Sequence, residues 1–453
     1  MSLPKYGEYK ASGFSWADEL PAHWSTASLK WLCKRYSGGT PDKARMEFWE
    51  NGTIPWLNSG AVNDGRIYEA SAYITHEAFE SSSAKWIPPG ALLIALAGQG
   101  KTKGMVAQLM FESTCNQSMA AIVPTTRIDA RYLYWWLTCN YQNIRNMAGG
   151  DLRDGLNLDL LGAIPCPLPS ADEQTAIATF LDRETAKIDA LIAEQEKLIA
   201  LVAEKRQAAI SHSVTKGLNP NAPTKDSGVA WLGEVPAHWE VGALKRYRGV
   251  TDCTHITAEF VDDGYPLASI REVQSRYVLL DAAKRTTRLY YEQLIEGGRQ
   301  PSPGDLIFSR NATVGEVAQV EKGHPPFAMG QDVCLLRRLC DDSSTDFMQF
   351  VIRSSVVVEQ LKNIMVGSTF KRVNVEEIRG LQVPAPPPEE QARIAAFLIE
   401  ECDTLDMLKR EAELAISLLR ERRSALIAAA VIGQLDVREA VAHAAEAQEA
   451  IAA

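Results

Sequence analysis

The spacing of apolar residues predicts two long helices, at 170–216 and 386–436, in which buried positions alternate four and three residues apart. The predicted seam of the first helix comprises Ile177, Leu181, Ile188, Leu191, Leu198 and Val202. The predicted seam of the second comprises Ile394, Leu398, Leu405, Leu408 and Leu419. A sustained alternation of this kind is typical of a coiled coil. We therefore expect the two helices to pack against each other, antiparallel, with packing of each helix only on its own half as the alternative.

The segments between these helices, at 25–168 and 241–385, have a different pattern. Short apolar runs bounded by Gly and Pro, at 53–60, 91–97, 264–270 and 305–309, are typical of strands. Asp129–Asn146 and Thr345–Ile364 each have the pattern of one helix. Both segments are thus predicted to be mixed α+β globules.

The chain also repeats itself. Lys10–Trp24 reads KASGFSWADELPAHW, and Lys225–Trp239 reads KDSGVAWLGEVPAHW, with nine identities in fifteen positions. A second pair of segments, QTAIATFL at 174–181 and QARIAAFL at 391–398, follows at almost the same offset. Between these pairs the match is faint but in step, with Gln117 opposite Gln331. Each half is therefore an opening motif, a variable middle and a long helix.

The resulting fold class is α+β, with two pseudo-repeated mixed α/β globules separated by two long helices that form an antiparallel coiled coil. We expect a first globule with its opening motif at 1–169 and the first helix at 170–216. A second opening motif and globule at 217–385, the second helix at 386–436 and an acidic, Ala-rich tail at 437–453 complete the chain.

The SGxxWxxxxPAHW motif and a long helix that opens at a Pro-rich stretch and Glu-Gln, each present twice, resemble the specificity subunit of type I restriction-modification systems. The resemblance implies two target-recognition domains, each reading half of a bipartite double-stranded DNA sequence, with the helices as a spacer. It implies that two methyltransferase subunits dock on the helices and that restriction-translocase subunits join them. It further implies that those partners use S-adenosylmethionine, and ATP with Mg²⁺, while this chain holds no cofactor.

The net charge of −10 argues against DNA binding, because an acidic chain is repelled by phosphates. Divided by segment, however, the middles carry only +1 (25–165) and −1 (240–385), while the helical regions 170–213 and 386–436 carry −3 and −4. The acidic excess therefore lies mainly outside the predicted reading surfaces.

Polar and basic residues that follow strand-like runs or occupy Gly-opened loops in both middles are the DNA-binding candidates. Arg and Lys suit guanine and phosphate, and Asn and Gln suit adenine. The candidates are Asn58, Ser59, Gln99, Lys101, Thr102, Lys103, Arg153, Ser269, Arg271, Arg310, Asn311, Thr313, Thr369, Lys371 and Arg372. A solvated loop is the alternative for each. The repeated residues Trp16, Trp24, Trp231, Trp239, His23 and His238 are predicted to be structural, since residues that read different half-sites should differ.

The sequence shows no catalytic constellation and no metal-ligand motif. Gly100-Lys101-Thr102 lacks the leading glycine of a phosphate-binding loop, because position 95 is alanine. No apolar stretch reaches the roughly 20 residues of a membrane span, and the eight scattered cysteines suggest reduced thiols in the cytoplasm. A non-catalytic DNA-recognition subunit is therefore predicted, ahead of a coiled-coil scaffold that binds proteins and of a divergent nucleotide hydrolase.

Overall fold

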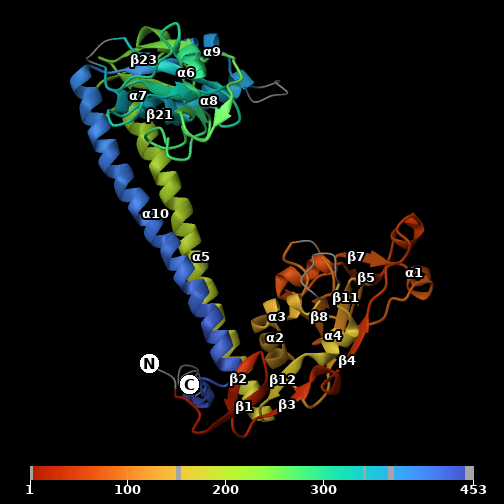
Figure 1. The fold of residues 1–453 in the computed structure, drawn as a ribbon. Helices are drawn as coiled ribbons and strands as arrows, with labels where there is room; N and C mark the ends of the chain where they lie inside the picture. Colours follow the sequence, from red (N-terminus) through yellow and green to blue (C-terminus); the bar gives the residue numbers. More distant parts are fainter. Residues whose placement is uncertain (1–3, 99, 149–154, 340–342, 366–371, 444–453) are drawn as a thin grey trace. The chain divides into compact units, whose positions relative to one another are not determined.

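The computed structural model describes residues 4–98, 100–148, 155–339, 343–365 and 372–443 (Figure 1). The chain divides into two compact units. The first unit comprises 1–194 and 415–453, and the second comprises 195–414. Each unit therefore contains one globule together with parts of both long helices.

The two long helices are α5, Ala171–Lys216, and α10, Pro388–Val431. Ser170 and Glu173 form a capping box at the start of α5, since Glu173 N–H donates to Ser170 Oγ and Ser170 N–H donates to the Glu173 carboxylate. Gly217 and Gly433 follow the helix ends with φ of +72° and +71°, the left-handed conformation that favours glycine. Helix α10 ends at Val431, five residues before the predicted end at 436.

Within each unit, α5 and α10 pair in antiparallel orientation, as predicted. In the first unit Arg423 Nε donates to Asp189 Oδ1 at 2.8 Å, and the start of α5 packs on the end of α10 through Ile177, Leu181, Ile427 and Val431. In the second unit Lys205 pairs with Glu401 at 2.9 Å, and the end of α5 meets the start of α10 through Ile210, Val214, Ile394 and Leu398. The helices are therefore partners as well as supports for their own globules.

The seam itself differs from the prediction at three positions. Leu191, Leu198 and Leu408 are exposed, at 51%, 39% and 39%. The observed inward positions of α5 include Ile188, Ile192, Gln195, Ile199 and Val202, which preserve the step of three and four. In α5 the predicted positions Leu191 and Leu198 each lie one residue before the observed seam positions Ile192 and Ile199. The helix-pairing prediction is correct, whereas these three leucines lie outside the seam.

The globule of the first unit is built on a five-stranded sheet, β4-β11-β8-β9-β6, and a smaller sheet, β10-β5-β7. The strands are β1 Tyr9–Phe14, β2 Ala17–Pro21, β3 Ser25–Ser28, β4 Cys33–Ser37, β5 Ile54–Leu57, β6 Arg66–Ile67, β7 Ala72–Ile74, β8 Leu92–Ala95, β9 Val106–Leu109, β10 Thr114–Cys115, β11 Met119–Pro124 and β12 Pro165–Leu168. β1 pairs with β2, and β3 with β12.

The second unit repeats this plan, with sheets β16-β23-β20-β21 and β17-β19-β18-β22. Its strands are β13 Thr224–Asp226, β14 Glu234–Pro236, β15 Glu240–Ala243, β16 Arg248–Asp252, β17 Phe260–Val261, β18 Tyr265–Ala268, β19 Arg285–Thr286, β20 Leu306–Ser309, β21 Val317–Gln319, β22 Ala328–Met329, β23 Val333–Arg338 and β24 Gln382–Ala385. β13 pairs with β14, and β15 with β24, so the same short ribbons recur.

The central strand of each large sheet is buried on both faces. In β8, Leu92 and Ile94 face the cluster shared with α5, while Leu93 and Ala95 face the smaller sheet. The same division holds in β20, where Leu306 and Phe308 face one cluster and Ile307 faces the other. Burial on both faces explains why these strands appear in the sequence as continuous apolar runs rather than as alternating patterns.

The short helices of the globules are α1 His76–Glu80, α2 Ala130–Cys139, α3 Tyr141–Asn146, α4 Leu158–Ala163, α6 Arg288–Ile295, α7 Thr345–Arg353, α8 Ser355–Met365 and α9 Val375–Gly380. The single helices predicted over 129–146 and 345–364 are therefore each two helices. Asn140 and Ser354 break them, and each buried side chain bonds a carbonyl of the preceding turn. Asn and Ser compete for backbone groups in this way and so interrupt helices.

The repeated opening motif forms the joint between globule and helix in each unit. Trp24 is fully buried and donates from Nε1 to Glu173 Oε1 at 3.2 Å, while His23 Nε2 lies 2.8 Å from the same oxygen. Trp239 and His238 bind Glu390 in the same way, at 3.1 and 2.8 Å. The structural role predicted for these residues is confirmed. The partly buried Trp16 packs on the same core, but Trp231 is 45% exposed and does not share the role.

The Glu-Gln pair at the start of each long helix has a second function. Gln174 accepts from the N–H of Asp129, the cap of α2, and donates to the Pro169 carbonyl. Gln391 accepts from the N–H of Ser344, the cap of α7, and donates to the Pro386 carbonyl. In each pair the glutamate therefore binds the opening motif, and the glutamine binds the N-terminal cap of a globule helix.

The described residues of the C-terminal segment, up to 443, pack on the first unit. Val437 is fully buried and Val441 packs on the first unit's core, and 438–443 are helical. The part of the chain that the structure describes contains no helix that is both long and apolar enough to cross a membrane. The seven cysteines in those same ranges form no disulfide.

Candidate nucleic-acid interface

Two predicted loops of the first unit meet at a short central loop, 116–118, between β10 and β11. Asn116 N–H donates to the Leu57 carbonyl at 3.0 Å, which joins the central loop to Asn58 and Ser59. On the other side, Leu96 N–H donates to the Ser118 carbonyl at 2.8 Å, which joins it to the loop after β8. The central loop is therefore anchored by its backbone on both sides.

The loop after β8 is held in turn by neighbouring elements. Leu156 N–H donates to the Leu96 carbonyl at 2.8 Å, which brings the segment before α4 against this loop. From α3, Tyr141 Oη donates to the Lys101 carbonyl at 2.6 Å and Arg145 Nη1 donates to the Lys103 carbonyl at 3.3 Å. Four segments distant in sequence therefore form one surface.

The second unit has the same arrangement around 330–332, between β22 and β23. Gly330 N–H donates to the Ala268 carbonyl and Arg310 N–H donates to the Asp332 carbonyl, both at 2.8 Å. Val373 N–H donates to the Arg310 carbonyl at 3.0 Å, and Asn311 and Arg372 form a β-bridge. The predicted sites at Ser269, Arg310–Thr313 and Arg372 are thus brought together.

Close packing and backbone strain mark this surface. A Cβ atom on Gly330 would lie 2.3 Å from Ser269 Oγ, so a larger residue there would require the Ser269 side chain to shift. Ala312 and Asp332 have φ of +54° and +67°, a conformation that costs non-glycine residues free energy and is concentrated at functional sites. Beside these loops lies a recess of about 860 Å³, whose lining includes Ser269 and Arg271.

The candidates differ in accessibility. Lys101 and Arg271 are exposed, and Ser59, Thr102, Ser269, Asn311 and Thr313 are partly buried. Asn58 is exposed and accepts from Gly60 N–H at 2.8 Å, so one of its oxygen lone pairs caps the following turn. Arg372 is exposed, with Nη2 3.5 Å from Asp332 Oδ1. Gln99, Arg153, Thr369 and Lys371 lie outside the described residues.

Two of the basic candidates require correction. Lys103 and Arg310 are each only 3% exposed. Arg310 Nη1 lies 2.8 Å from Asp252 Oδ1, and its backbone supports both neighbouring loops. A guanidinium that is buried and ion-paired is not available to a base edge. In this structure these two side chains support the loops rather than form the exposed surface.

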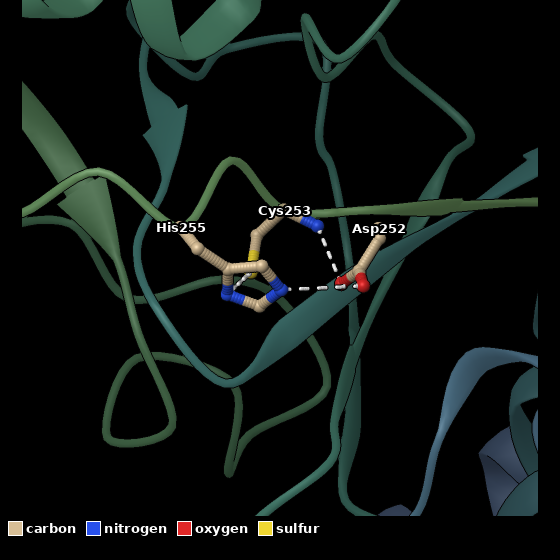
Figure 2. Close-up of side chains that lie close together, drawn as sticks. All are labelled: Asp252, Cys253 and His255. Carbon is tan, nitrogen blue, oxygen red and sulfur yellow. Dashed lines mark hydrogen bonds and ion pairs between the residues drawn. The ribbon is translucent and has the colours of Figure 1, made fainter.

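Asp252, Cys253 and His255 offer the second unit's candidate metal ligands (Figure 2). Cys253 Sγ lies 3.9 Å from His255 Nδ1, and His255 Nε2 lies 3.5 Å from Asp252 Oδ2. A thiolate, an imidazole and a carboxylate are the donors that zinc prefers. However, burial and the Asp252 charge raise the pKa of the Cys253 thiol, and the Arg310 guanidinium already occupies the carboxylate. The geometry therefore indicates that Asp252 binds the Arg310 guanidinium rather than a metal cation.

Sequence reasoning left Gln117 and Gln331 out of the candidates. Each is exposed and is the middle residue of a central loop. The two glutamines occupy corresponding positions of the internal repeat, which is the one sequence feature that could have identified them. Because the repeat is faint in this region, that correspondence indicates a role only together with the tertiary contacts.

A family model described as the type I restriction modification DNA specificity domain matches residues 21–200 and 285–414. The EcoR124I/EcoR124II specificity subunit of Escherichia coli is 31% identical over 187 residues, which are 40% of this chain and 45% of that one. The chain thus matches less than half the length of this relative. The EcoKI specificity subunit of E. coli K12 is 20% identical over 439 residues, 92% of this chain and 90% of that one.

Among solved structures, a chain from work on assembly and conformational transition of a type I R-M system has a TM-score of 0.71 with this one. The two are 16% identical, and the alignment covers 92% of this chain and 99% of the other. This likeness concerns the fold, and it agrees with the repeated two-globule plan.

Proposed function

Because the chain belongs to the family of type I restriction-modification DNA specificity subunits, we propose that each of its two globules reads one half of a bipartite double-stranded DNA sequence. The observation that carries this proposal is the equivalent set of loops around 116–118 and 330–332. Two loop sets of the same design but different residues suit two half-sites of different sequence. Base edges are read by side chains held on such fixed backbones.

We further propose that the loops combine phosphate and base contacts. Exposed Lys101, Arg271 and Arg372 supply positive charge that positions the backbone. Asn58, Ser59, Asn311 and Thr313 supply donors and acceptors to base edges. Thr102 and Ser269 line the same surfaces. Since the globules are nearly neutral, we expect this chain alone to bind DNA weakly at physiological salt. Basic partner subunits would raise the affinity of the complex through further phosphate contacts.

The exposed leucines of the long helices support a docking role. Leu191 in the first unit and Leu198, Leu201 and Leu408 in the second leave apolar surface on helices whose inward seams are already filled. Apolar side chains exposed on these helices would gain free energy if a partner buried them. We propose that two methyltransferase subunits dock there and that restriction-translocase subunits join the complex. These partners would use S-adenosylmethionine, and ATP with Mg²⁺, and this chain would contribute recognition without catalysis.

The test is a methylome. The chain is expressed with a methyltransferase subunit of a type I system, in a host without other methylation, and modified sequences are mapped. A bipartite motif with a fixed spacer supports the proposal, whereas scattered methylation without a motif contradicts it. In a second arm, residues 25–165 are exchanged for the corresponding segment of a relative. One half of the motif should change, and a change in both halves would contradict independent reading.

A further inference from the structure

The middle residue of the central loop is glutamine in both globules, although the loops differ around it. Asn116-Gln117-Ser118 and Gly330-Gln331-Asp332 each connect a short parallel strand, β10 or β22, to an interior strand of the large sheet, β11 or β23. The loops have the same length, and each glutamine opens a turn. The two side chains therefore occupy equivalent positions in the two units.

The backbone of each glutamine is fixed from both sides. In the first unit the residue before Gln117 bonds the Leu57 carbonyl, and the residue after it accepts from Leu96. In the second unit Gly330 and Asp332 make the same two bonds, to Ala268 and from Arg310. A side chain that starts from so constrained a backbone can present its amide without first ordering the loop, which lowers the entropic cost of recognition.

Identity between the halves has a structural explanation for Trp24 and Trp239, but not for these glutamines. Both tryptophans are fully buried and bonded to the helix carboxylates. Gln117 and Gln331 are exposed, and among the described residues Gln331 Nε2 donates one bond, of 3.2 Å, to Thr257 Oγ1 at the edge of the recess. This leaves its amide oxygen and a second N–H available.

We infer that Gln117 and Gln331 are specificity-determining residues that read an A·T pair at equivalent positions of the two half-sites. A glutamine amide offers one donor and one acceptor side by side, which match N7 and N6 of adenine in the major groove. The same residue at the same place in both globules implies that the half-sites share this pair. Differences at the neighbouring positions then account for half-sites that differ elsewhere. The inference rests on the proposed function.

The experiment uses the full chain with its methyltransferase subunit and compares methylomes of the wild type, Gln117→Ala and Gln331→Ala. Each variant should lose discrimination at one A·T position of one half-site, by about 5- to 150-fold, and keep the other half-site unchanged. The two variants should act on different halves. Competition binding, with duplexes in which that single pair is replaced, measures the same ratio without depending on methyl transfer.

Gln331→Glu sharpens the test, because it keeps the shape of the side chain and removes its donor. A carboxylate accepts from cytosine N4, so the preferred base at that position should move from A towards C. Gln300→Ala is the matched control, since Gln300 is exposed between α6 and β20 and only its main-chain carbonyl is bonded. Its motif should equal that of the wild type. Co-purification with the methyltransferase subunit establishes that each variant is folded.

Distinct outcomes separate the two proposals. A wild-type methylome without a bipartite motif would refute the proposed function itself. A bipartite motif whose halves share no A·T pair, or folded variants at 117 and 331 that leave the motif unchanged, would overturn the inference while the proposed function stands.

Discussion

His23 Nε2 lies 2.8 Å from Glu173 Oε1, at the point where the opening motif meets the first turn of α5. The same contact recurs between His238 and Glu390, at 2.8 Å. One carboxylate therefore binds both the imidazole and the indole of a Pro-Ala-His-Trp tetrapeptide. This joint explains why the tetrapeptide and the glutamate are the parts of the sequence that repeat most clearly.

The joint predicts a pH-dependent stability. Burial raises the pKa of the Glu173 carboxyl, but hydrogen bonds from His23, Ser170 and Trp24 outweigh it, so that pKa lies below its ordinary value. A carboxyl whose pKa is lowered by folding stabilises the folded state at pH values above its pKa in the unfolded chain, which is near 4.3. This stabilisation is lost as the pH falls through the pKa of the folded state. Glu173→Gln should therefore cost about 2 kcal/mol of unfolding free energy at pH 7, and much less at pH 3.

Urea unfolding of both proteins at the two pH values measures this difference. Glu8→Gln, an exposed carboxylate of the same globule, is the control and should change stability by under about 0.5 kcal/mol. An equal cost for Glu173→Gln at pH 7 and pH 3 would contradict a role for its charge.

The corrected seam predicts opposite behaviour for two adjacent residues. Val202 is 7% exposed and lies in the seam, while Leu201 is 52% exposed. Val202→Ala should lower the unfolding free energy by about 1 to 2 kcal/mol, and Leu201→Ala should leave it nearly unchanged but weaken binding of the methyltransferase subunit. Thermal unfolding and titration calorimetry separate the two effects. Equal destabilisation by both would contradict the observed seam.

Arg310 and Arg271 should differ in the same way on the reading surface. Arg310→Met removes one partner of a buried ion pair, and we expect a loss of about 3 kcal/mol in stability, since Asp252 remains partly exposed. Arg271→Ala should leave the melting temperature unchanged and reduce the salt dependence of DNA binding by a slope of about 1. Salt titrations of binding by the assembled complex measure the slope. An unchanged slope would remove Arg271 from the interface.

Zinc should have no stabilising effect on the second unit. A cation held by Asp252, Cys253 and His255 at a hundred times its dissociation constant would add about 2.7 kcal/mol. The Arg310 charge and the raised pKa of Cys253 oppose such binding. We therefore expect identical melting curves with zinc and with EDTA. A zinc-dependent rise that is lost in His255→Ala would establish a metal site.

The helices are expected to set the spacer. Seven residues inserted into both α5, beside Gln195, and α10, beside Ala412, preserve the seam and add about 10 Å of helix. The spacer of the methylated motif should lengthen by about three base pairs, because base pairs are stacked about 3.4 Å apart. The same insertion into α5 alone should disrupt the helix pairing and abolish methylation. An unchanged spacer in the double insertion would contradict the proposal.

The sequence by itself determined the elements and their repetition. The apolar runs at 91–97 and 305–309 became central strands because residues buried on both faces must all be apolar. The capping box and the glycines at 217 and 433 set the helix ends through local backbone chemistry. The structural role of Trp24 and Trp239 also followed from their repetition.

Only the tertiary structure decided which residues are accessible. Leu191 and Ile192 are equally apolar, so their order along the helix does not reveal which of them faces α10. Arg310 and Arg271 have the same side chain, and burial beside Asp252 alone separates them. Gln117 and Gln331 gained meaning when backbone hydrogen bonds from distant strands placed each between two loops. Such contacts depend on sheet topology, which no local pattern encodes.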